Sequence, residues 1–428
     1  MTSVCRTFSC TKTSSANASR MSKSSRCDVA DIKKMQADEV QQPLRILELY
    51  SGIGGMHVAA KESGLLFDIV GSYEINTTAL EVYRHNFPKT PKAYNIMGLT
   101  LDNLESLSPD IIMMSPPCQP FTRQGLKRDV EDTRTSSLLH LIGLLEKLSH
   151  PPTMILLENV AGFEKSLARE QLMEMLRSKN YVWQEFLLSP TEFGIPNSRL
   201  RYYLLAKQQL YPFCLDVSDE IKEELTACLC IRRDIQAPVL SDAREICANC
   251  GKPVIDSLQN LLRNFHGNIH NELHQPGKSY SDLSLSLSSF MESDINLEPY
   301  LLKDKVLSKY CMILDIVDKE SKRSCCFTKG YGHYVEGTGS VIKGNSDLDV
   351  DAVYNRLSRL ELGDPERLDL LKQLKFRYFT ANEILRLMCF PKWFSFPPSL
   401  TVKQKYRVLG NSINILVVTS LLLILCER

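Results

Sequence analysis

The sequence lacks a strong excess of charge of either sign. Its 428 residues carry 51 Lys and Arg against 50 Asp and Glu, a formal net charge of +1. Proteins that coat nucleic acid without regard to sequence depend on a large basic excess, so this balance argues against that class. Local basic clusters can still contact phosphates. They include Arg123, Lys127, Arg128 and Arg134, and further along the chain Lys322, Arg323 and Lys329.

A hydrophobic signal peptide and a long apolar run are also lacking. Residues 413–426 are apolar but shorter than the roughly 18 residues that suggest a membrane span, so we expect a buried helix there and no membrane partner. Without a signal peptide, the 14 cysteines are better explained as reduced thiols than as disulfides. We therefore expect the protein in the cytoplasm, the nucleus or both.

Residues 1–42 contain no acidic residue before Asp28 and are rich in Ser and Thr. This composition predicts a disordered extension. It also resembles an organelle transit peptide, although no clear apolar face accompanies the arginines. We favour a dispensable tail, with Met21 as a later start, and leave organelle targeting open.

The cysteines and histidines lack the regular spacing of a zinc site. One C-x-x-C pair, Cys247 and Cys250, is present, but a single pair without a regularly spaced partner is a weak signal. We therefore assign no metal from the sequence. Other side chains that offer ligands in principle are Cys228, Cys230, His266 and His270.

Among the features that are present, a glycine-rich turn follows the first predicted strand. Residues 44–50 run into Ser51-Gly52-Ile53-Gly54-Gly55, after which a helical pattern begins. Glycines let the backbone approach a ligand, and the helix N-terminus offers free amides. A second predicted strand, 68–73, ends at Glu74, where an acid commonly binds ribose hydroxyls. The spacing favours S-adenosylmethionine, with a dinucleotide as the alternative.

Two prolines present a cysteine at the end of another predicted strand. Residues 111–115 lead into Pro116-Pro117-Cys118. Because proline fixes φ and removes a backbone donor, the thiol would lie on a stiff loop, which suits a nucleophile. Taken alone, Cys118 would more simply be a buried, inert thiol.

Two further apolar stretches bring charged side chains to strand ends. Residues 154–157 deliver Glu158, and Arg199 and Arg201 open the next apolar stretch. Ligands of open α/β sheets bind at such an edge, so we expect these charges to lie with Cys118 at one edge of one sheet. In isolation, each charge is as easily a helix-end or surface group.

In their order along the chain, these motifs resemble those of the cytosine-C5 methyltransferases. The resemblance covers nearly all of residues 44–207 and again 376–418. A narrower match, at Cys326-Phe327-Thr328 and the glycines that follow, is similar to the signature of the tRNA-aspartate branch, which methylates a cytosine at position 38 in the anticodon loop of tRNA-Asp. The motifs are residues 50–55, Glu74-Ile75-Asn76, residues 116–121, Glu158-Asn159-Val160, Arg199-Leu200-Arg201 and Gly410-Asn411-Ser412.

The resemblance implies an α/β, Rossmann-like methyltransferase fold, with a mostly parallel sheet, helices on both faces and a smaller target-recognition domain. It divides the chain into a catalytic, cofactor-binding domain at 43–207, a target-recognition domain with a flexible insert at 208–375, and a segment at 376–428 that returns to the first domain. Within the second domain we expect a loop over 279–289 and a helix over 301–317.

The resemblance also implies the cofactor, S-adenosyl-L-methionine, and roles for individual residues. Catalytic roles fall on Cys118, Glu158, Arg199 and Arg201. Cofactor contacts fall on Tyr50, Ser51, Gly52, Ile53, Gly54, Gly55, Glu74, Ile75, Asn95, Ile96, Pro116, Asn411 and Ser412. Substrate contacts fall on Gln119, Phe121, Arg123, Cys326, Phe327 and Thr328, with the rings of Phe121, Phe327 and Tyr331 as stacking partners. At Asn95 the chain departs from many relatives, which have an aspartate.

Known chemistry explains why these residue types occur together. A thiolate at Cys118 would add to carbon 6 of cytosine and make carbon 5 nucleophilic, and nearby guanidiniums would favour the thiolate. A protonated Glu158 would bond to ring nitrogen 3. The base must leave its stack to reach such a pocket, which costs less in a loop. The partner that the resemblance implies is tRNA, most simply tRNA-Asp, with DNA left open as a second partner.

Three alternatives stay open. A DNA cytosine-C5 methyltransferase explains every motif except Cys326-Phe327-Thr328, and it also leaves the low basicity of the chain unexplained. An inactive RNA-binding protein would tolerate losses at the site, yet Cys118, Glu158 and Arg201 are all present. A dinucleotide oxidoreductase leaves the Pro-Pro-Cys loop unexplained.

Overall fold

The computed structural model describes residues 42–117, 136–211, 213–230, 246–250, 252, 254–267 and 278–427. Four predicted site residues, Cys118, Gln119, Phe121 and Arg123, lie outside these ranges, as does the predicted extension up to residue 41. Residues 1–42 and 43–428 are separate units, and the second is described below.

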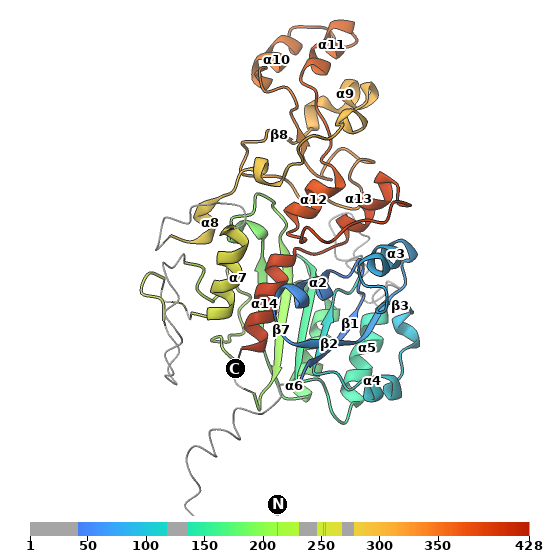
Figure 1. Ribbon diagram of the computed structural model, residues 1–428, viewed down its shortest axis with the longest axis vertical. Helices are drawn as coiled ribbons and strands as arrows, with labels where there is room; N and C mark the ends of the chain where they lie inside the picture. Colours follow the sequence, from blue (N-terminus) through green and yellow to red (C-terminus); the bar gives the residue numbers. More distant parts are fainter. Residues whose placement is uncertain are drawn as a thin grey trace, which may run out of the picture. The chain divides into compact units, whose positions relative to one another are not determined.

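A seven-stranded sheet in the order β3-β2-β1-β4-β5-β7-β6 lies at the centre of this unit (Figure 1). Strands β1 to β5 are parallel to one another, whereas β7 runs antiparallel to both β5 and β6. The start of β7 therefore meets the end of β5, where Arg201 pairs with Val160. The strands are Leu44–Leu49 (β1), Phe67–Glu74 (β2), Lys92–Ala93 (β3), Ile111–Met114 (β4), Met154–Val160 (β5), Tyr181–Leu188 (β6) and Arg201–Gln208 (β7).

Helices cover both faces of the sheet because the central strands are buried on both sides. In β4, Ile111 and Met113 join the apolar core on one face, and Ile112 and Met114 join the core on the other. The first face carries α2 (Gly55–Glu62), α3 (Thr77–Asn86), α7 (Asp256–Gly267) and α14 (Ile415–Cys426), and the second carries α4 (Leu101–Leu107), α5 (Ser136–Lys147) and α6 (Leu167–Ser178). The predicted α/β architecture, a mostly parallel sheet with helices on both faces, is confirmed.

The C-terminal segment returns to the sheet. Helix α14 contacts α2, α7 and β7, and its apolar residues are buried almost throughout. Within residues 402–426 an 18-residue window has a mean hydropathy of 2.2, which by length and composition alone would suffice to cross a membrane, but 89% of that window is buried inside the protein. The expected buried helix is confirmed. Before it lie α12 (Ala381–Leu387) and α13 (Val402–Gly410), each beginning at a capping box.

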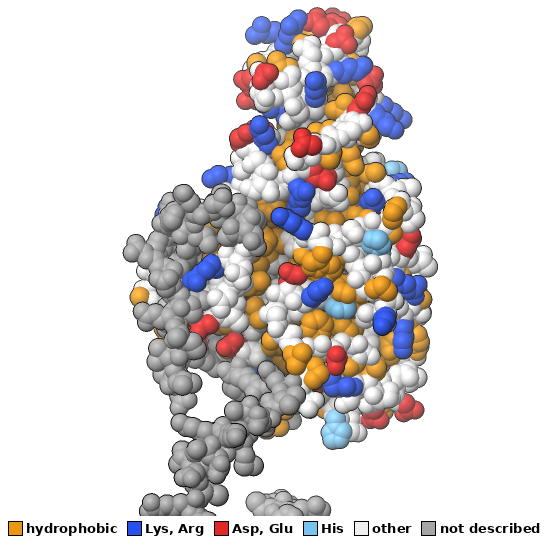
Figure 2. Space-filling view, in the orientation of Figure 1, with side chains coloured by type: hydrophobic (Ala, Val, Ile, Leu, Met, Phe, Trp, Pro, Cys, Tyr) orange, Lys and Arg blue, Asp and Glu red, His pale blue; other side chains and the backbone are white. Residues whose placement is uncertain are grey.

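Residues between β7 and α12 form mostly short elements, and one group of them has a small apolar core of its own. Figure 2 shows acidic and basic side chains interspersed over α9–α11 on the face in view. The elements are α8 (Tyr280–Leu283), α9 (Asp304–Tyr310), α10 (Val350–Leu357), α11 (Pro365–Gln373), β8 (Ile316–Val317) and β9 (Val341–Ile342). The predicted domain boundaries stay a prediction.

Two local predictions in this region are wrong. The expected loop over 279–289 contains α8, whose start is stabilised by a capping box between Ser279 and Asp282. The expected helix over 301–317 ends at Tyr310, and β8 follows because it pairs with β9. That partner strand is distant in sequence, so local periodicity does not reveal it.

Candidate active site

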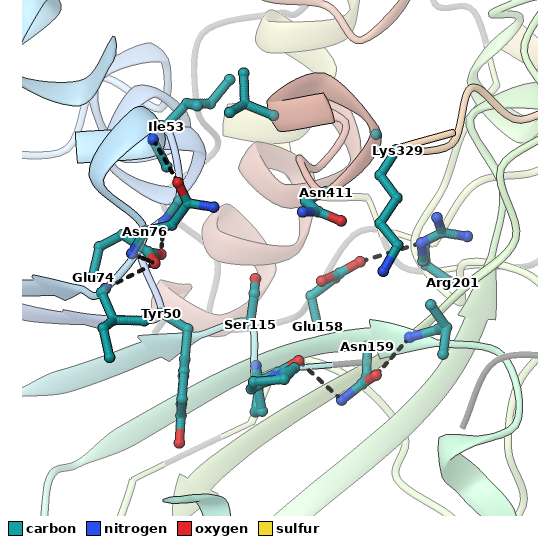
Figure 3. Close-up of a pocket in the computed structure, with 18 of the residues that line it drawn as sticks. Tyr50, Ile53, Glu74, Asn76, Ser115, Glu158, Asn159, Arg201, Lys329 and Asn411 are labelled. Carbon is teal, nitrogen blue, oxygen red and sulfur yellow. Dashed lines mark hydrogen bonds and ion pairs between the residues drawn. The ribbon is translucent and has the colours of Figure 1, made fainter. Parts of the chain in front are cut away.

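The glycine turn after β1 lines a cavity of about 270 Å³ at the carboxyl ends of β1, β4 and β5 (Figure 3). Gly54 has φ of 88°, a left-handed conformation that strains any other residue. Gly55 has a different role, because a Cβ added there would lie 2.7 Å from Cγ1 of Ile413. Gly52 is left-handed as well, with φ of 53°, so the turn needs two glycines for its backbone conformation and one for close packing against the returning C-terminal segment.

Glu74, at the end of β2, is held by three backbone amides. Its carboxylate accepts from the N–H groups of Gly52 at 2.7 Å, Ile75 at 2.8 Å and Asn76 at 2.7 Å. A carboxylate offers about four acceptor positions, so one stays available to a hydroxyl in the cavity. Beside it, the buried Oγ of Ser51 has no hydrogen-bond partner within the described residues. These acceptors fit the ribose and polar groups of a nucleoside cofactor.

Asn95 and Ile96 stand apart from this cavity. The side chain of Asn95 accepts from the N–H of Met97 at 3.0 Å and begins a short turn, Ile96–Gly98. Asn95 is exposed and Ile96 is buried, and neither lines the cavity. Their assignment to the cofactor stays a prediction.

Glu158, near the end of β5, is buried at the opposite end of the cavity. Its Oε1 lies 3.5 Å from Nε of Arg201. Burial raises the pKa of this carboxyl, and Arg201, Arg199 and a hydrogen bond with Ser115 only partly oppose the rise. Glu158 is therefore more easily protonated than an ordinary glutamate, as an acid that bonds to a ring nitrogen must be.

Arg199 joins two segments that are far apart in sequence. Its guanidinium donates to the carbonyl oxygens of Phe327 at 3.2 Å and Gly410 at 3.3 Å, and also to that of Ser412. Only 3% of the residue is exposed, and burial lowers the pKa of the group. Arg199 lines the cavity, but most of its hydrogen bonds position backbone around it.

Cys326 lies between the two arginines. Its Sγ is 3.3 Å from Nη1 of Arg199 and 3.7 Å from Nη2 of Arg201. Burial by itself would raise the pKa of the thiol, but the two guanidiniums outweigh burial and lower it. The predicted substrate segment thus begins with a thiol that is electrostatically tied to the Arg199-Leu200-Arg201 motif.

The aromatic residues of this segment are buried. Phe327 is 1% exposed and Tyr331 is 2% exposed, and their ring centroids are 5.0 Å apart. Phe327 also packs against Phe379. Neither ring presents a face to a base, so the expected stacking by Phe327 and Tyr331 is wrong. Assignment of Cys326, Phe327 and Thr328 to the substrate stays a prediction.

Several cavity residues were not assigned a role from the sequence. The Nδ2 of Asn159 donates to the Pro116 carbonyl at 3.5 Å, and Figure 3 shows Lys329 reaching toward Glu158. Asn159 lies within the Glu158-Asn159-Val160 motif and Lys329 directly follows Cys326-Phe327-Thr328, and this nearness to a motif is the signal that could have identified them. Others in this group are Asn76, Ala79, Ser115, Pro117, Val160, Val408 and Gly410.

The structure therefore brings ten predicted residues to one cavity and leaves others around it. Cys118 lies outside the described residues, but Pro117 immediately before it lines the cavity. The ten are Tyr50, Gly52, Ile53, Glu74, Ile75, Pro116, Glu158, Arg199, Arg201 and Asn411. Those that do not line it are Ser51, Gly54, Gly55, Asn95, Ile96, Cys326, Phe327, Thr328 and Ser412.

Comparison with known proteins agrees with this arrangement. The family model for the C-5 cytosine-specific DNA methylases matches residues 44–425. A tRNA (cytosine(38)-C(5))-methyltransferase from Homo sapiens is 43% identical, with 90% of this chain and 100% of that one covered. A DNA (cytosine-5)-methyltransferase from Dictyostelium discoideum is 36% identical, with 90% and 94% covered.

A solved structure is similar over the same length. The crystal structure of a mutant DNMT2 from Spodoptera frugiperda superposes with a TM-score of 0.71 at 40% identity, covering 90% of this chain and 100% of the other. The two chains thus share one overall fold. The chain belongs to the C-5 cytosine-specific DNA methylase family, whose methyl donor is S-adenosyl-L-methionine.

Proposed function

We propose that this protein methylates carbon 5 of the cytosine at position 38 in the anticodon loop of tRNA-Asp. The observation that carries the proposal is a single cavity that joins the glycine turn and Glu74 to Glu158 and Arg201. The relative from Homo sapiens, which is a tRNA (cytosine(38)-C(5))-methyltransferase by name, supports the choice of nucleic acid.

In the proposed reaction, the thiolate of Cys118 adds to carbon 6 of the extruded cytosine and forms a C–S bond. Glu158 holds a proton, favoured by its burial, for ring nitrogen 3, and its other oxygen accepts from the exocyclic amine. S-adenosyl-L-methionine supplies the methyl group that carbon 5 receives. A base then removes the carbon 5 proton, the C–S bond breaks, and the thiolate leaves with its electron pair.

The cofactor end of the cavity would hold the donor through groups that are already oriented. Glu74 accepts from ribose hydroxyls, and the backbone of the glycine turn allows close approach. Arg199 keeps Gly410 and Ser412 in place beside the cavity. The cytosine would occupy the Glu158 end of the cavity, where Lys329 also lines the wall and offers a cation.

Transfer of labelled methyl groups to purified tRNA and to duplex DNA, measured in parallel, tests the proposal. We expect labelling of tRNA-Asp transcripts that disappears when position 38 is changed to uridine and when Cys118→Ala replaces the wild type. Cys325→Ser, which alters an exposed thiol, is the matched control and should retain activity.

Labelling of duplex DNA but not of tRNA would contradict the proposal. It would favour the second candidate, a DNA cytosine-C5 methyltransferase, which the Dictyostelium discoideum relative supports by name. Labelling of several tRNAs that carry a cytosine at position 38 would retain the chemistry and remove the restriction to tRNA-Asp.

We further propose that the protein acts in the cytoplasm or the nucleus, since tRNA is present in both. Fluorescent fusions of the full chain and of a chain that begins at Met21 should then have the same distribution. Mitochondrial localisation of the full chain alone would identify the first residues as a targeting segment instead.

A further inference from the structure

Four cysteines gather in the segment between β7 and α8, away from the candidate active site. They are Cys228, Cys230, Cys247 and Cys250, and their four Sγ atoms all lie within 4.8 Å of one another. The first three are buried and Cys250 is exposed. None of the four lines the active-site cavity. In the sequence they form two separate pairs, C-x-C and C-x-x-C. Only the tertiary structure shows that the two pairs lie close together.

The size and composition of this group fit one metal ion. Zn²⁺ binds thiolates at about 2.3 Å in a tetrahedron, which places neighbouring sulfurs about 3.8 Å apart. Sulfurs that already lie within 4.8 Å can close to that distance with small side-chain rotations. Four soft thiolate ligands favour zinc over oxygen-seeking cations such as Mg²⁺. Four protein ligands leave no open position, which is typical of a structural rather than a catalytic site.

The backbone around the sulfurs is arranged to stabilise thiolates. The N–H of Cys230 donates to Sγ of Cys228 at 3.4 Å, and the N–H groups of Asn249 and Cys250 donate to Sγ of Cys247. Hydrogen bonds to the ligand atoms orient them and offset their charge. The Cys247 turn is closed by its own N–H, which donates to the Lys252 carbonyl at 3.0 Å.

The cluster lies where separate segments of this insert meet, and the Lys252 side chain also donates across them to the Leu225 carbonyl at 2.9 Å. Val254 is the one partly buried apolar residue packed on the cluster within the described part of the chain. The Gln259 side chain, on α7, donates to the Cys228 carbonyl at 2.6 Å, and Cys230 forms an antiparallel bridge with Ser279. Helix α7 in turn contacts α14. A metal here would fasten this insert to the helices that cover the sheet.

We propose that Cys228, Cys230, Cys247 and Cys250 bind one structural zinc ion as thiolates. The spacing of the two cysteine pairs in the sequence does not predict a metal site. His266 is one of the other side chains that the sequence offers as a ligand. In the structure, His266 stacks on Tyr280 with ring centroids 4.7 Å apart and does not belong to the four-sulfur group. His270 lies outside the described residues.

The metal content of the full-length protein tests this proposal. Protein purified from cells grown with zinc and dialysed against a weak chelator should retain about one zinc ion per chain. Inductively coupled plasma mass spectrometry measures this content. Cys250→Ser and Cys228→Ser should lose most of it. Cys325→Ser is the matched control because Cys325 is an exposed thiol outside the cluster, and it should keep the full content.

Cobalt substitution of the wild type keeps the test decisive if Cys228→Ser fails to fold. Co²⁺ in place of zinc should produce the intense visible bands of a tetrahedral four-thiolate site, and Zn²⁺ should abolish them. Wild-type protein with no retained zinc and no such bands would overturn the proposal, as would disulfides among the four cysteines under non-reducing alkylation. Because these readouts are independent of methyl transfer, they do not depend on the proposed function.

Discussion

At one end of the cavity, the glycine turn and Glu74 come from two adjacent parallel strands and meet through backbone amides. At the other end, Glu158, Arg201, Lys329 and Gly410 come from separate segments and meet through charged side chains and one close backbone approach. The first end, which would hold the cofactor, is thus built from local chain geometry. The second, the base end, where the cytosine base would lie, is built from long-range contacts. We expect the base end to be the more sensitive to single substitutions.

The largest expected effect is at Glu158. Glu158→Gln keeps the shape and a hydrogen bond but removes the proton that the acid would share with ring nitrogen 3. We expect the single-turnover rate of methyl transfer to fall by about 10² to 10⁴ while the affinity for S-adenosylhomocysteine is unchanged. Single-turnover kinetics and calorimetry measure the two quantities.

Glu146→Gln is the matched control, because Glu146 is an exposed carboxylate on α5. It should leave both quantities as in the wild type. A Glu158→Gln enzyme that kept most of its rate would show that the base end does not depend on this carboxyl.

The second largest effect is expected at Gly410, where the backbone packs directly against the backbone of Thr328 and Lys329. A Cβ at this position would lie 2.0 Å from the backbone nitrogen of Lys329, so Gly410→Ala must displace one of the two segments. A shift of about 1 Å at a reacting site can reduce the rate by about 10²-fold, and we expect a loss of that size. Methyl transfer at saturating cofactor measures it.

Gly143→Ala provides the comparison for Gly410→Ala. Gly143 lies in α5 with nothing within 4 Å of an added Cβ, and alanine favours the helix. We expect unchanged activity and stability that is equal or higher by up to about 1 kcal/mol. Equal activity of the two alanine variants would mean that the close approach at Gly410 is unimportant.

A smaller and different effect is expected at the cofactor end. Glu74→Gln replaces a charged acceptor of three amides by a neutral one, and hydrogen bonds to charged groups contribute about 1.5 to 3 kcal/mol. The dissociation constant for S-adenosylhomocysteine should rise roughly 10- to 100-fold, with little change in rate at saturation. Asp68→Asn, an exposed acid on the same strand, should change neither. If Glu74→Gln lowered the rate at saturation but not the affinity, the cofactor end would be acting in catalysis and the contrast between the two ends of the cavity would be wrong.

The mildest prediction concerns Glu48, which lies in β1 behind the cofactor end. Burial raises the pKa of this carboxyl to about 7, and Tyr83 donates to it at 2.6 Å. In an unfolded chain the pKa is about 4.3, so between these values the native state holds more protons and loses stability as the pH rises.

Glu48→Gln removes this titration. Relative to the variant, the wild type should lose on the order of 1–3 kcal/mol of unfolding free energy between about pH 5.5 and about pH 8. Urea unfolding at both pH values measures the difference. Parallel stability profiles for the two proteins would show that Glu48 is not a neutral acid in the native state.

The contrast between local geometry and long-range contacts also explains which parts of the site could be predicted from the sequence. The glycine turn, Glu74 and the prolines before Cys118 each lie within a few residues of a strand end, so their placement follows from local pattern. The role of Arg199 in holding Phe327, Gly410 and Ser412 depends on contacts between distant segments, which no local pattern contains. The stacking predicted for Phe327 and Tyr331 failed for the same reason, since burial is a property of the packed core.

By itself, the sequence determined the positions of β1, β2, β4 and β5 and of the glycine turn, the family resemblance and about half of the residues around the cavity, because strand periodicity, proline and glycine act locally. The tertiary structure alone decided that β7 runs antiparallel and so brings Arg201 beside Glu158, that Lys329 meets Gly410, and that four cysteines from two separate pairs share one site. Each of these depends on which distant segments pack together, and that is set by burial of the whole apolar core.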